Sequence, residues 1–100
     1  MLRPLSTALL LASALSAHAQ ETAGTARLLA ATCASCHGTE GRSSTPEPGS
    51  LAGRRAADIV AAMQAFRDGK RPATVMQQLA RGYSAGEVER MAAFFAAQKP

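Results

Sequence analysis

Cys33-Ala34-Ser35-Cys36-His37 is the stretch that decides how this 100-residue chain folds. Its two thiols stand three positions apart, so a helical turn places them on one side, and the imidazole follows directly. The pattern C-x-x-C-H is the attachment motif for c-type haem. In this arrangement Cys33 and Cys36 form thioethers with the two vinyl groups of one porphyrin, while His37 is the proximal iron ligand. The motif therefore predicts one covalently bound haem c.

Three interpretations without haem use the same residues. A structural zinc site needs four ligands, but only Cys33, Cys36 and His37 cluster, because the other histidine, His18, lies near the amino terminus. A thioredoxin-type redox pair normally begins a helix in a fold that contains a sheet. A disulfide between the two cysteines would close a very small loop and stabilise the fold little. A thiol or zinc module is therefore the weakest of the hypotheses considered.

Residues 1–19 have the form of a secretory signal peptide. One positive charge at Arg3 precedes an apolar run centred on residues 9–15, and Ala17-His18-Ala19 has the small-x-small pattern of a signal-peptidase site. The apolar run is too short to span a bilayer, and no second long apolar segment follows. We therefore expect cleavage after Ala19, a mature domain over residues 20–100 without a membrane span, and a periplasmic location.

The composition indicates one small domain that needs a cofactor to complete its core. Hydrophobic residues make up 47% of the chain, but alanine dominates them, with only three Phe, one Tyr and no Trp. An alanine-rich core buries little apolar area, and small domains are marginally stable. The 11 Lys and Arg residues only slightly outnumber the 7 Asp and Glu residues. Scattered arginines without aromatic platforms argue against nucleic-acid binding.

Helical spacing and capping residues predict an all-α domain. Ile59, Met63 and Phe66 fall at positions i, i+4 and i+7, which share one face of a helix. Ser84 and Glu87 have the spacing of a capping box, in which each side chain pairs with a backbone N–H at a helix start. No segment alternates in the manner of a strand. We expect helices over residues 22–32, 55–68, 73–81 and from Ser84 to the C-terminus, with a long loop over residues 38–53.

The second axial position of a haem iron also needs a ligand, and the mature domain has no second histidine. Methionine is the next candidate, at Met63, Met76 and Met91. Met63 and Met91 lie on the apolar stripes of predicted helices, where packing is the commoner role. Met76 instead follows the break at residues 69–72, so we expect it to ligate the iron. A thioether ligand favours ferrous iron and a comparatively high reduction potential.

Nearly the whole mature domain, from about Arg27 to Gln98, resembles class I c-type cytochromes. Three stretches carry the resemblance: CASCHGTEG at residues 33–41, SLAG at 50–53 and RPATVMQQLARGYSAGEVERMAAFFAAQ at 71–98. The last is similar to the haem subunit of flavocytochrome c sulfide dehydrogenases and to cytochrome c4-type domains. In that group the methionine of R-P-A-T-x-M is the axial ligand, which implies Met76. The resemblance implies a small cytochrome c-like fold of about four helices wrapped around one haem.

The chain departs from this group in two ways. The family commonly has proline directly before Ser-Leu-Ala-Gly, in a loop whose carbonyl fixes the proximal histidine, whereas this chain has Pro48-Gly49-Ser50-Leu51. Cytochrome c4 has two such domains, and this chain has one. The resemblance favours a flavoprotein sulfide dehydrogenase subunit as redox partner, for a stand-alone carrier or a subunit of a complex.

These observations predict an exported electron-transfer protein rather than an enzyme. Its iron cycles between ferric and ferrous states, accepting single electrons from a dehydrogenase partner and passing them to a downstream acceptor. The alternative is an open-site haem protein, ligand-binding or peroxidase-like, which holds if Met76 does not ligate the iron. Tyr83 and Arg71 are weaker candidates for contacts with the haem propionates. A basic cluster near Arg71 in the sequence is a candidate docking patch for an acidic partner, with a solvated helix end as the alternative: Arg54, Arg55, Arg67, Lys70 and Arg71.

Overall fold

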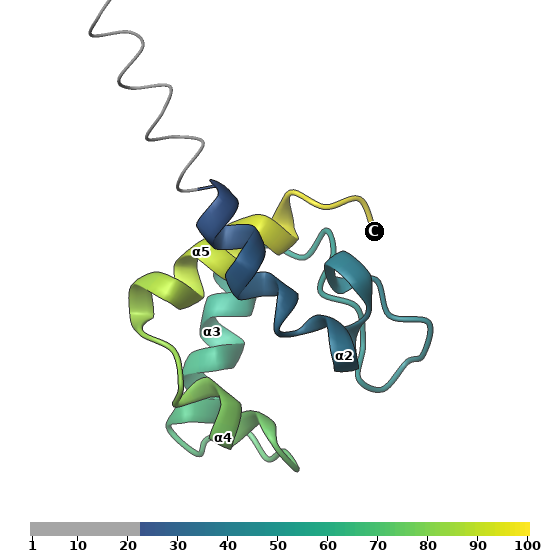
Figure 1. Ribbon diagram of the computed structural model, residues 1–100. Coiled ribbons are helices and arrows are strands. Elements are labelled where there is room, and N and C mark those ends of the chain that lie inside the picture. Colours follow the sequence, from purple (N-terminus) through teal and green to yellow (C-terminus); the bar gives the residue numbers. More distant parts are fainter. Residues whose placement is uncertain (1–22) are drawn as a thin grey trace, which may run out of the picture.

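The computed structural model describes residues 23–100, and these form helices, turns and loops but no strand. The described part begins with a helix over residues 23–31 (Figure 1). The all-α prediction is confirmed. The elements that follow are α2 (Ala34–His37), the 3-10 turn η1 (Thr39–Gly41), α3 (Ala56–Arg67), α4 (Met76–Ala80) and α5 (Ala85–Ala96).

The signal peptide predicted over residues 1–19 lies outside the described residues. Within residues 23–100, no helix combines the length and the apolar character that crossing a membrane requires.

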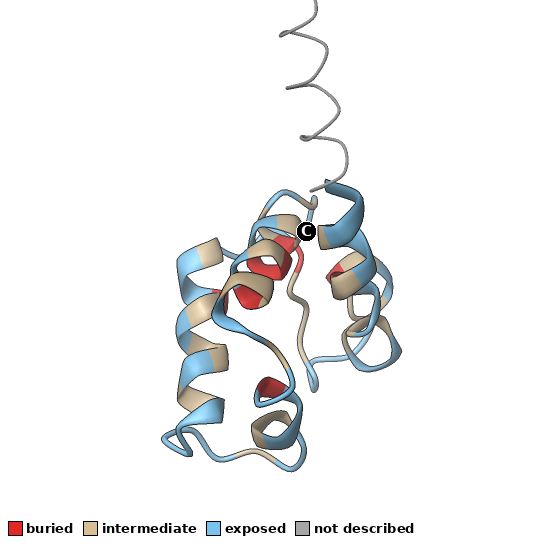
Figure 2. Cartoon of the chain, turned by 60° about the vertical axis from the view of Figure 1, so that its left-hand side comes forward, coloured by how far each residue is buried: buried red, intermediate tan, exposed pale blue. Residues whose placement is uncertain are grey.

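A cluster of buried side chains joins the amino-terminal helix to α3 and α5. Four of its six members belong to α5, and Figure 2 shows buried positions concentrated along that helix. Among the described residues no large side chain is completely enclosed, which agrees with the small, alanine-rich core expected from composition. The members of the cluster are Ala30, Ile59, Val88, Met91, Ala92 and Phe95.

The bounds of α3 and the start of α5 lie close to the predicted positions, whereas α5 ends at Ala96 and not at the C-terminus. α3 covers residues 56–67, against a prediction of 55–68. The capping box of α5 is formed at both contacts: the Glu87 backbone N–H donates to Ser84 Oγ at 3.2 Å, and the Ser84 N–H donates to Glu87 Oε2 at 2.9 Å. Two orphan donors at the helix start are therefore satisfied, as the sequence predicted.

α4 is shorter than the helix predicted over residues 73–81, because it begins only at Met76. Val75 has φ −131° and ψ −22°, which is outside the helical region. Thr74 and Val75 are both β-branched, and such side chains lose rotamer freedom in a helix. An irregular segment over residues 68–75 therefore separates α3 from α4 and places Met76 at the first position of its helix.

The basic residues near α3 do not form one patch. Arg54 and Arg55 precede the helix, whereas Arg67, Lys70 and Arg71 lie at or beyond its other end. A 12-residue helix is about 18 Å long at 1.5 Å per residue. The five residues therefore form two groups at opposite ends of α3, and the docking role suggested by the sequence stays a prediction.

Candidate functional site

The cysteine motif forms a helical turn of its own directly after the amino-terminal helix. The Cys33 backbone N–H donates to the Ala30 carbonyl at 3.1 Å, which closes the first helix. The Cys33 carbonyl then accepts from the N–H groups of Cys36 at 3.3 Å and His37 at 2.9 Å. The backbone therefore gives Cys33, Cys36 and His37 the i, i+3, i+4 spacing of one helix face. This local geometry matches the one predicted from the spacing.

The two cysteines are free thiols in different surroundings. Cys33 is half-buried and packs against the core cluster, whereas Cys36 is exposed. Burial raises the pKa of the Cys33 thiol. Cys33 Sγ lies 3.9 Å from Thr32 Oγ1, and Cys36 Sγ lies 3.8 Å from Ser35 Oγ.

A backbone carbonyl fixes the proton on the imidazole of His37. His37 Nδ1 lies 2.7 Å from the carbonyl oxygen of Gly49. A carbonyl only accepts hydrogen bonds, so Nδ1 carries a proton, and in the neutral ring the lone pair is then on Nε2. This is the tautomer that ligates a metal through Nε2, with an oriented ring. Gly49 therefore supplies the carbonyl in this chain, one position beyond Pro48.

Hydrogen bonds on either side of Gly49 hold that carbonyl in place. The Ser43 N–H donates to Ser50 Oγ at 2.9 Å, and Arg54 Nε donates to the Ser50 carbonyl at 2.7 Å. The Leu51 N–H donates to the Gly41 carbonyl at 2.8 Å. The loop therefore folds back on itself and presents Gly49 to His37.

Two glycines make this return of the chain sterically possible. Gly38 has φ +84°, and a Cβ there would overlap the Arg42 carbonyl. Gly41 has φ +80°, and a Cβ there would lie 2.7 Å from Phe95 Cδ1. Glycine is the residue that adopts positive φ without steric cost. The loop beyond His37 therefore lies directly against α5.

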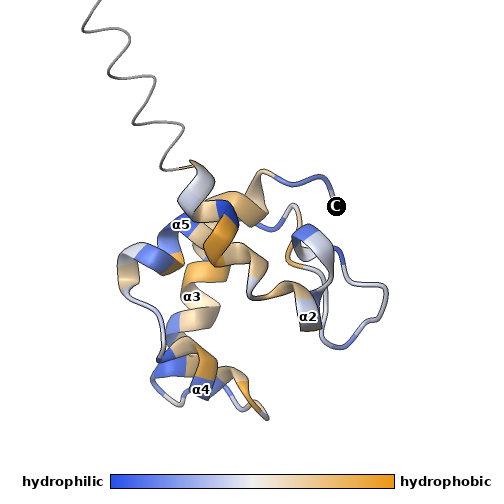
Figure 3. Ribbon diagram, in the orientation of Figure 1, coloured by the Kyte–Doolittle hydropathy of each residue, from blue (hydrophilic) through white to orange (hydrophobic). Residues whose placement is uncertain are grey.

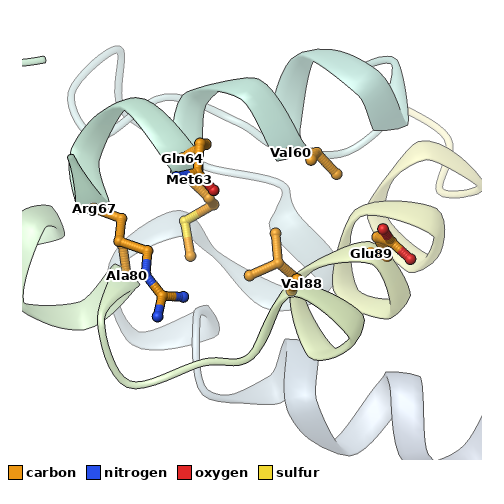
Figure 4. A pocket seen from close by; sticks show the side chains of 8 residues that line it. Val60, Met63, Gln64, Arg67, Ala80, Val88 and Glu89 are labelled. Carbon is orange, nitrogen blue, oxygen red and sulfur yellow. The ribbon is translucent and has the colours of Figure 1, made fainter. Parts of the chain in front are cut away.

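The three methionines of the described chain occupy different environments. Met91 is only 3% exposed and belongs to the core cluster, as its place on an apolar stripe predicted. Met63 lines a pocket of about 50 Å³ between α3 and α5, together with Val88 and Ala80 (Figure 4). Met76 is half-buried and, unlike Met63 and Met91, is neither a member of the core cluster nor packed against it.

Two apolar side chains beside Met76 are uncovered. Val75 is 52% exposed and Leu79 is 50% exposed, and they lie one helical turn apart. Within residues 23–100 no group of three His, Cys, Asp or Glu side chains is placed to hold a metal ion. Two thiols on one turn, a free imidazole Nε2 and an uncovered apolar surface fit a haem c group.

Tyr83 and Arg71 both make contacts within the protein. Tyr83 Oη lies 2.7 Å from Thr32 Oγ1, and Arg67 Nη1 donates to the Tyr83 carbonyl at 3.0 Å. The guanidinium of Arg71 lies 4.7 Å from the centroid of the Phe66 ring, in cation–π geometry.

Sequence reasoning missed three contributors to the site. Gly49 was hidden because its carbonyl, not a side chain, makes the contact, although a Pro-Gly pair in a long loop is a turn signal. Thr32 and the Ser43–Ser50 pair gave no distinctive signal, because serine and threonine are common in loops.

Comparison with known proteins identifies the class. The family model described as cytochrome c oxidase, cbb3-type, subunit III matches residues 20–95. The chain therefore belongs to the c-type cytochromes, the electron-transfer proteins whose cofactor is haem c.

Three curated relatives refine this placement. The cytochrome subunit of sulfide dehydrogenase from Chlorobaculum tepidum is 40% identical over 68 residues, which cover 68% of this chain and 61% of the relative. Cytochrome c4 from Pseudomonas aeruginosa is 36% identical over 83 residues, covering 83% of this chain and 41% of the relative. Cytochrome c-554(548) from Halomonas halodenitrificans is 34% identical over 71 residues, covering 68% of this chain and 86% of the relative. The chain thus spans less than two thirds of the first two proteins.

Proposed function

We propose that this chain is a monohaem electron carrier of the periplasm. The observation that carries the proposal is the bond between His37 Nδ1 and the Gly49 carbonyl, on the same helical turn as two free thiols. It leaves Nε2 as a ligand whose orientation is fixed before any metal is bound. Export rests on the signal-peptide pattern of residues 1–19.

In this proposal four residues hold one haem c. Cys33 and Cys36 would attach it through two thioethers, and His37 and Met76 would bind its iron. When bound, the haem supplies an iron that alternates between ferric and ferrous states. The backbone contact makes the imidazole of His37 a better donor, and the thioether of Met76 favours the reduced state. With His37 and Met76 both binding the iron, the bound haem would serve electron transfer rather than reaction with a substrate.

The proposed partner is a flavoprotein subunit of a sulfide dehydrogenase, with a separate downstream acceptor. This rests on the similarity to the cytochrome subunit of sulfide dehydrogenase. Arg71 remains a proposed contact for a haem propionate, because its guanidinium lies at the surface beside the segment that carries Met76.

The first test is the identity of the axial ligands in the holoprotein. The chain is expressed in a host that matures c-type cytochromes, and the oxidised form is examined for haem that survives acid extraction. We expect covalent haem and the weak long-wavelength band of methionine-ligated ferric iron. Met76→Ala should abolish that band, whereas Met63→Leu and Met91→Leu, which change packing methionines, should keep it.

Two other outcomes contradict the proposal. Covalent haem with a high-spin ferric spectrum in the unaltered protein would mean an open iron, and a ligand-binding or peroxidase-like role would replace electron transfer. A purified chain without haem would instead favour the thiol or zinc module as the role of Cys33 and Cys36.

A further inference from the structure

A pair of hydroxyl groups links the cysteine turn to the start of α5. Tyr83 Oη and Thr32 Oγ1 lie 2.7 Å apart, although 51 positions separate them in the sequence. Thr32 Oγ1 also lies 2.8 Å from the Leu29 carbonyl, at the end of the amino-terminal helix. The contact thus bridges two segments that meet only through the fold.

The number of protons available settles the direction of this bond. A threonine hydroxyl has one proton, and the Leu29 carbonyl only accepts, so Thr32 donates to Leu29. Tyr83 must therefore donate to Thr32. With its proton used in this way, Tyr83 has only lone pairs left, and a carboxylate such as a haem propionate would not be attracted to them.

Tyr83 is itself firmly held. Its ring packs against the core cluster, and its carbonyl accepts a hydrogen bond from Arg67 at the end of α3. Ser84, the next residue, caps α5 through a complete capping box. Thr32 is therefore tied to a fixed point where α3 and α5 meet.

Thr32 directly precedes Cys33, and its hydroxyl lies 3.9 Å from that sulfur. Cys33 is half-buried against the core cluster. Because Thr32 is its neighbour in the chain, fixing the position of Thr32 also restricts the position of the Cys33 side chain. Cys36 is different, because it is exposed and its sulfur contacts the neighbouring Ser35 of the same turn. The hydrogen bond from Tyr83 therefore restrains Cys33 and not Cys36.

We propose that the Tyr83–Thr32 hydroxyl pair positions the Cys33 thiol for haem attachment. Cys33 is then held in place before haem binds, whereas Cys36 adjusts its position to the haem. This inference rests on the proposed function, in which both cysteines bind haem. It makes Tyr83 and Thr32 positioning residues and removes Tyr83 from the propionate contacts considered above.

Single-cysteine backgrounds separate this role from general stabilisation. Tyr83→Phe and Thr32→Val each remove one hydroxyl and keep the shape of the side chain. In a Cys36→Ala background, where attachment depends on Cys33, both should lower the fraction of chains carrying covalent haem, measured by intact mass. We expect a loss of about two- to tenfold, the equilibrium equivalent of one neutral hydrogen bond. Thr32→Ser should restore the parent value, and the double variant should lose no more than either single variant.

In a Cys33→Ala background the same two changes should leave the haem-bearing fraction unchanged. Equal losses in both backgrounds would overturn the proposal, because they would mean that the pair only stabilises the fold. Additive losses of thermal stability in the two-cysteine holoprotein would also overturn it, since the two hydroxyls would then be uncoupled. If the unaltered two-cysteine chain carries no covalent haem, the proposed function itself fails.

Discussion

Two regions of this small domain are held together in different ways. The helical layer, defined as residues 23–31 with α3 and α5, contains the whole buried cluster. The site segment, defined as residues 32–55, buries only Gly41 and Ala52. Figure 3 shows the same contrast, with hydrophobic colour along the crossing helices and hydrophilic colour along much of the loop.

Under the proposed function, the difference predicts which part of the chain depends on the haem. Side-chain burial stabilises the helical layer, whereas the site segment relies on backbone contacts, glycine conformations and a few ion pairs. Each hydrogen bond contributes only about 1 kcal/mol net to stability. An apolar cofactor would give the site segment the buried surface that its own side chains do not provide.

Removing the sulfurs of the two proposed attachment residues, Cys33 and Cys36, should separate the two regions most strongly. We expect the Cys33→Ala, Cys36→Ala double variant to lose haem and, with it, the order of the site segment. Hydrogen exchange followed by mass spectrometry should show near-unfolded rates over residues 38–53, with measurable protection remaining in α5. Ser35→Ala, a change between the two cysteines, should leave the pattern unaltered. Uniform loss of protection across the chain would contradict the contrast between the regions.

The ring of Phe95 is the main contact between the regions. It is 2% exposed, it lies against Gly41, and the Phe95 carbonyl accepts from the Gly53 N–H at 2.9 Å. Phe95→Ala should lower the free energy of unfolding by about 3–5 kcal/mol, measured by denaturant titration of the holoprotein. Phe94→Ala is the matched control, because the adjacent Phe94 is only half-buried, and its cost should be clearly smaller.

Two glycines of similar conformation distinguish backbone strain from packing. Gly41 and Gly69 have φ +80° and +71°, but only a Cβ at Gly41 would meet another group within 4 Å. Gly69→Ala should cost about 1–2 kcal/mol from the left-handed backbone alone. Gly41→Ala should cost about 1–3 kcal/mol more, since it also overpacks the contact with Phe95. Equal costs in thermal unfolding would show that the loop does not press on α5.

The smallest expected effect concerns Glu40 at the edge of the site segment. Its carboxylate pairs with Arg42 at 2.9 Å and with Arg27 at 3.4 Å, and Arg42 is the main cause of its lowered pKa. A carboxyl group with a lowered pKa in the folded state stabilises the fold above its unfolded pKa. This contribution is lost as the pH falls through the folded value.

Glu40→Gln should therefore be slightly less stable than the parent at neutral pH and equally stable in acid. The difference should shrink with added salt, because the carboxylate is partly exposed to solvent. Thermal unfolding across pH at two ionic strengths tests this. A difference that persists below the folded pKa would mean that the side chain acts by packing.

Local patterns in the sequence predicted the features that depend on neighbours along the chain. The helical cysteine turn, the extent of α3 and the Ser84–Glu87 capping box all follow from spacings of three or four residues. The start of α4 was missed because two β-branched residues after a proline outweigh an apolar pattern. Gly49 and the Tyr83–Thr32 contact were missed because they join segments far apart in the sequence, and one of them uses only a backbone atom.

The carbonyl that orients His37 has a practical consequence for engineering this protein. Because the acceptor belongs to the main chain, no substitution at Gly49 deletes it, and the contact changes only when the loop moves. The course of that loop is set by Ser43, Ser50 and Arg54. Substitutions at these residues therefore change the orientation of the imidazole indirectly and in small steps. A series of variants with small differences in imidazole orientation is therefore best made at these three residues, with His37 itself left unchanged.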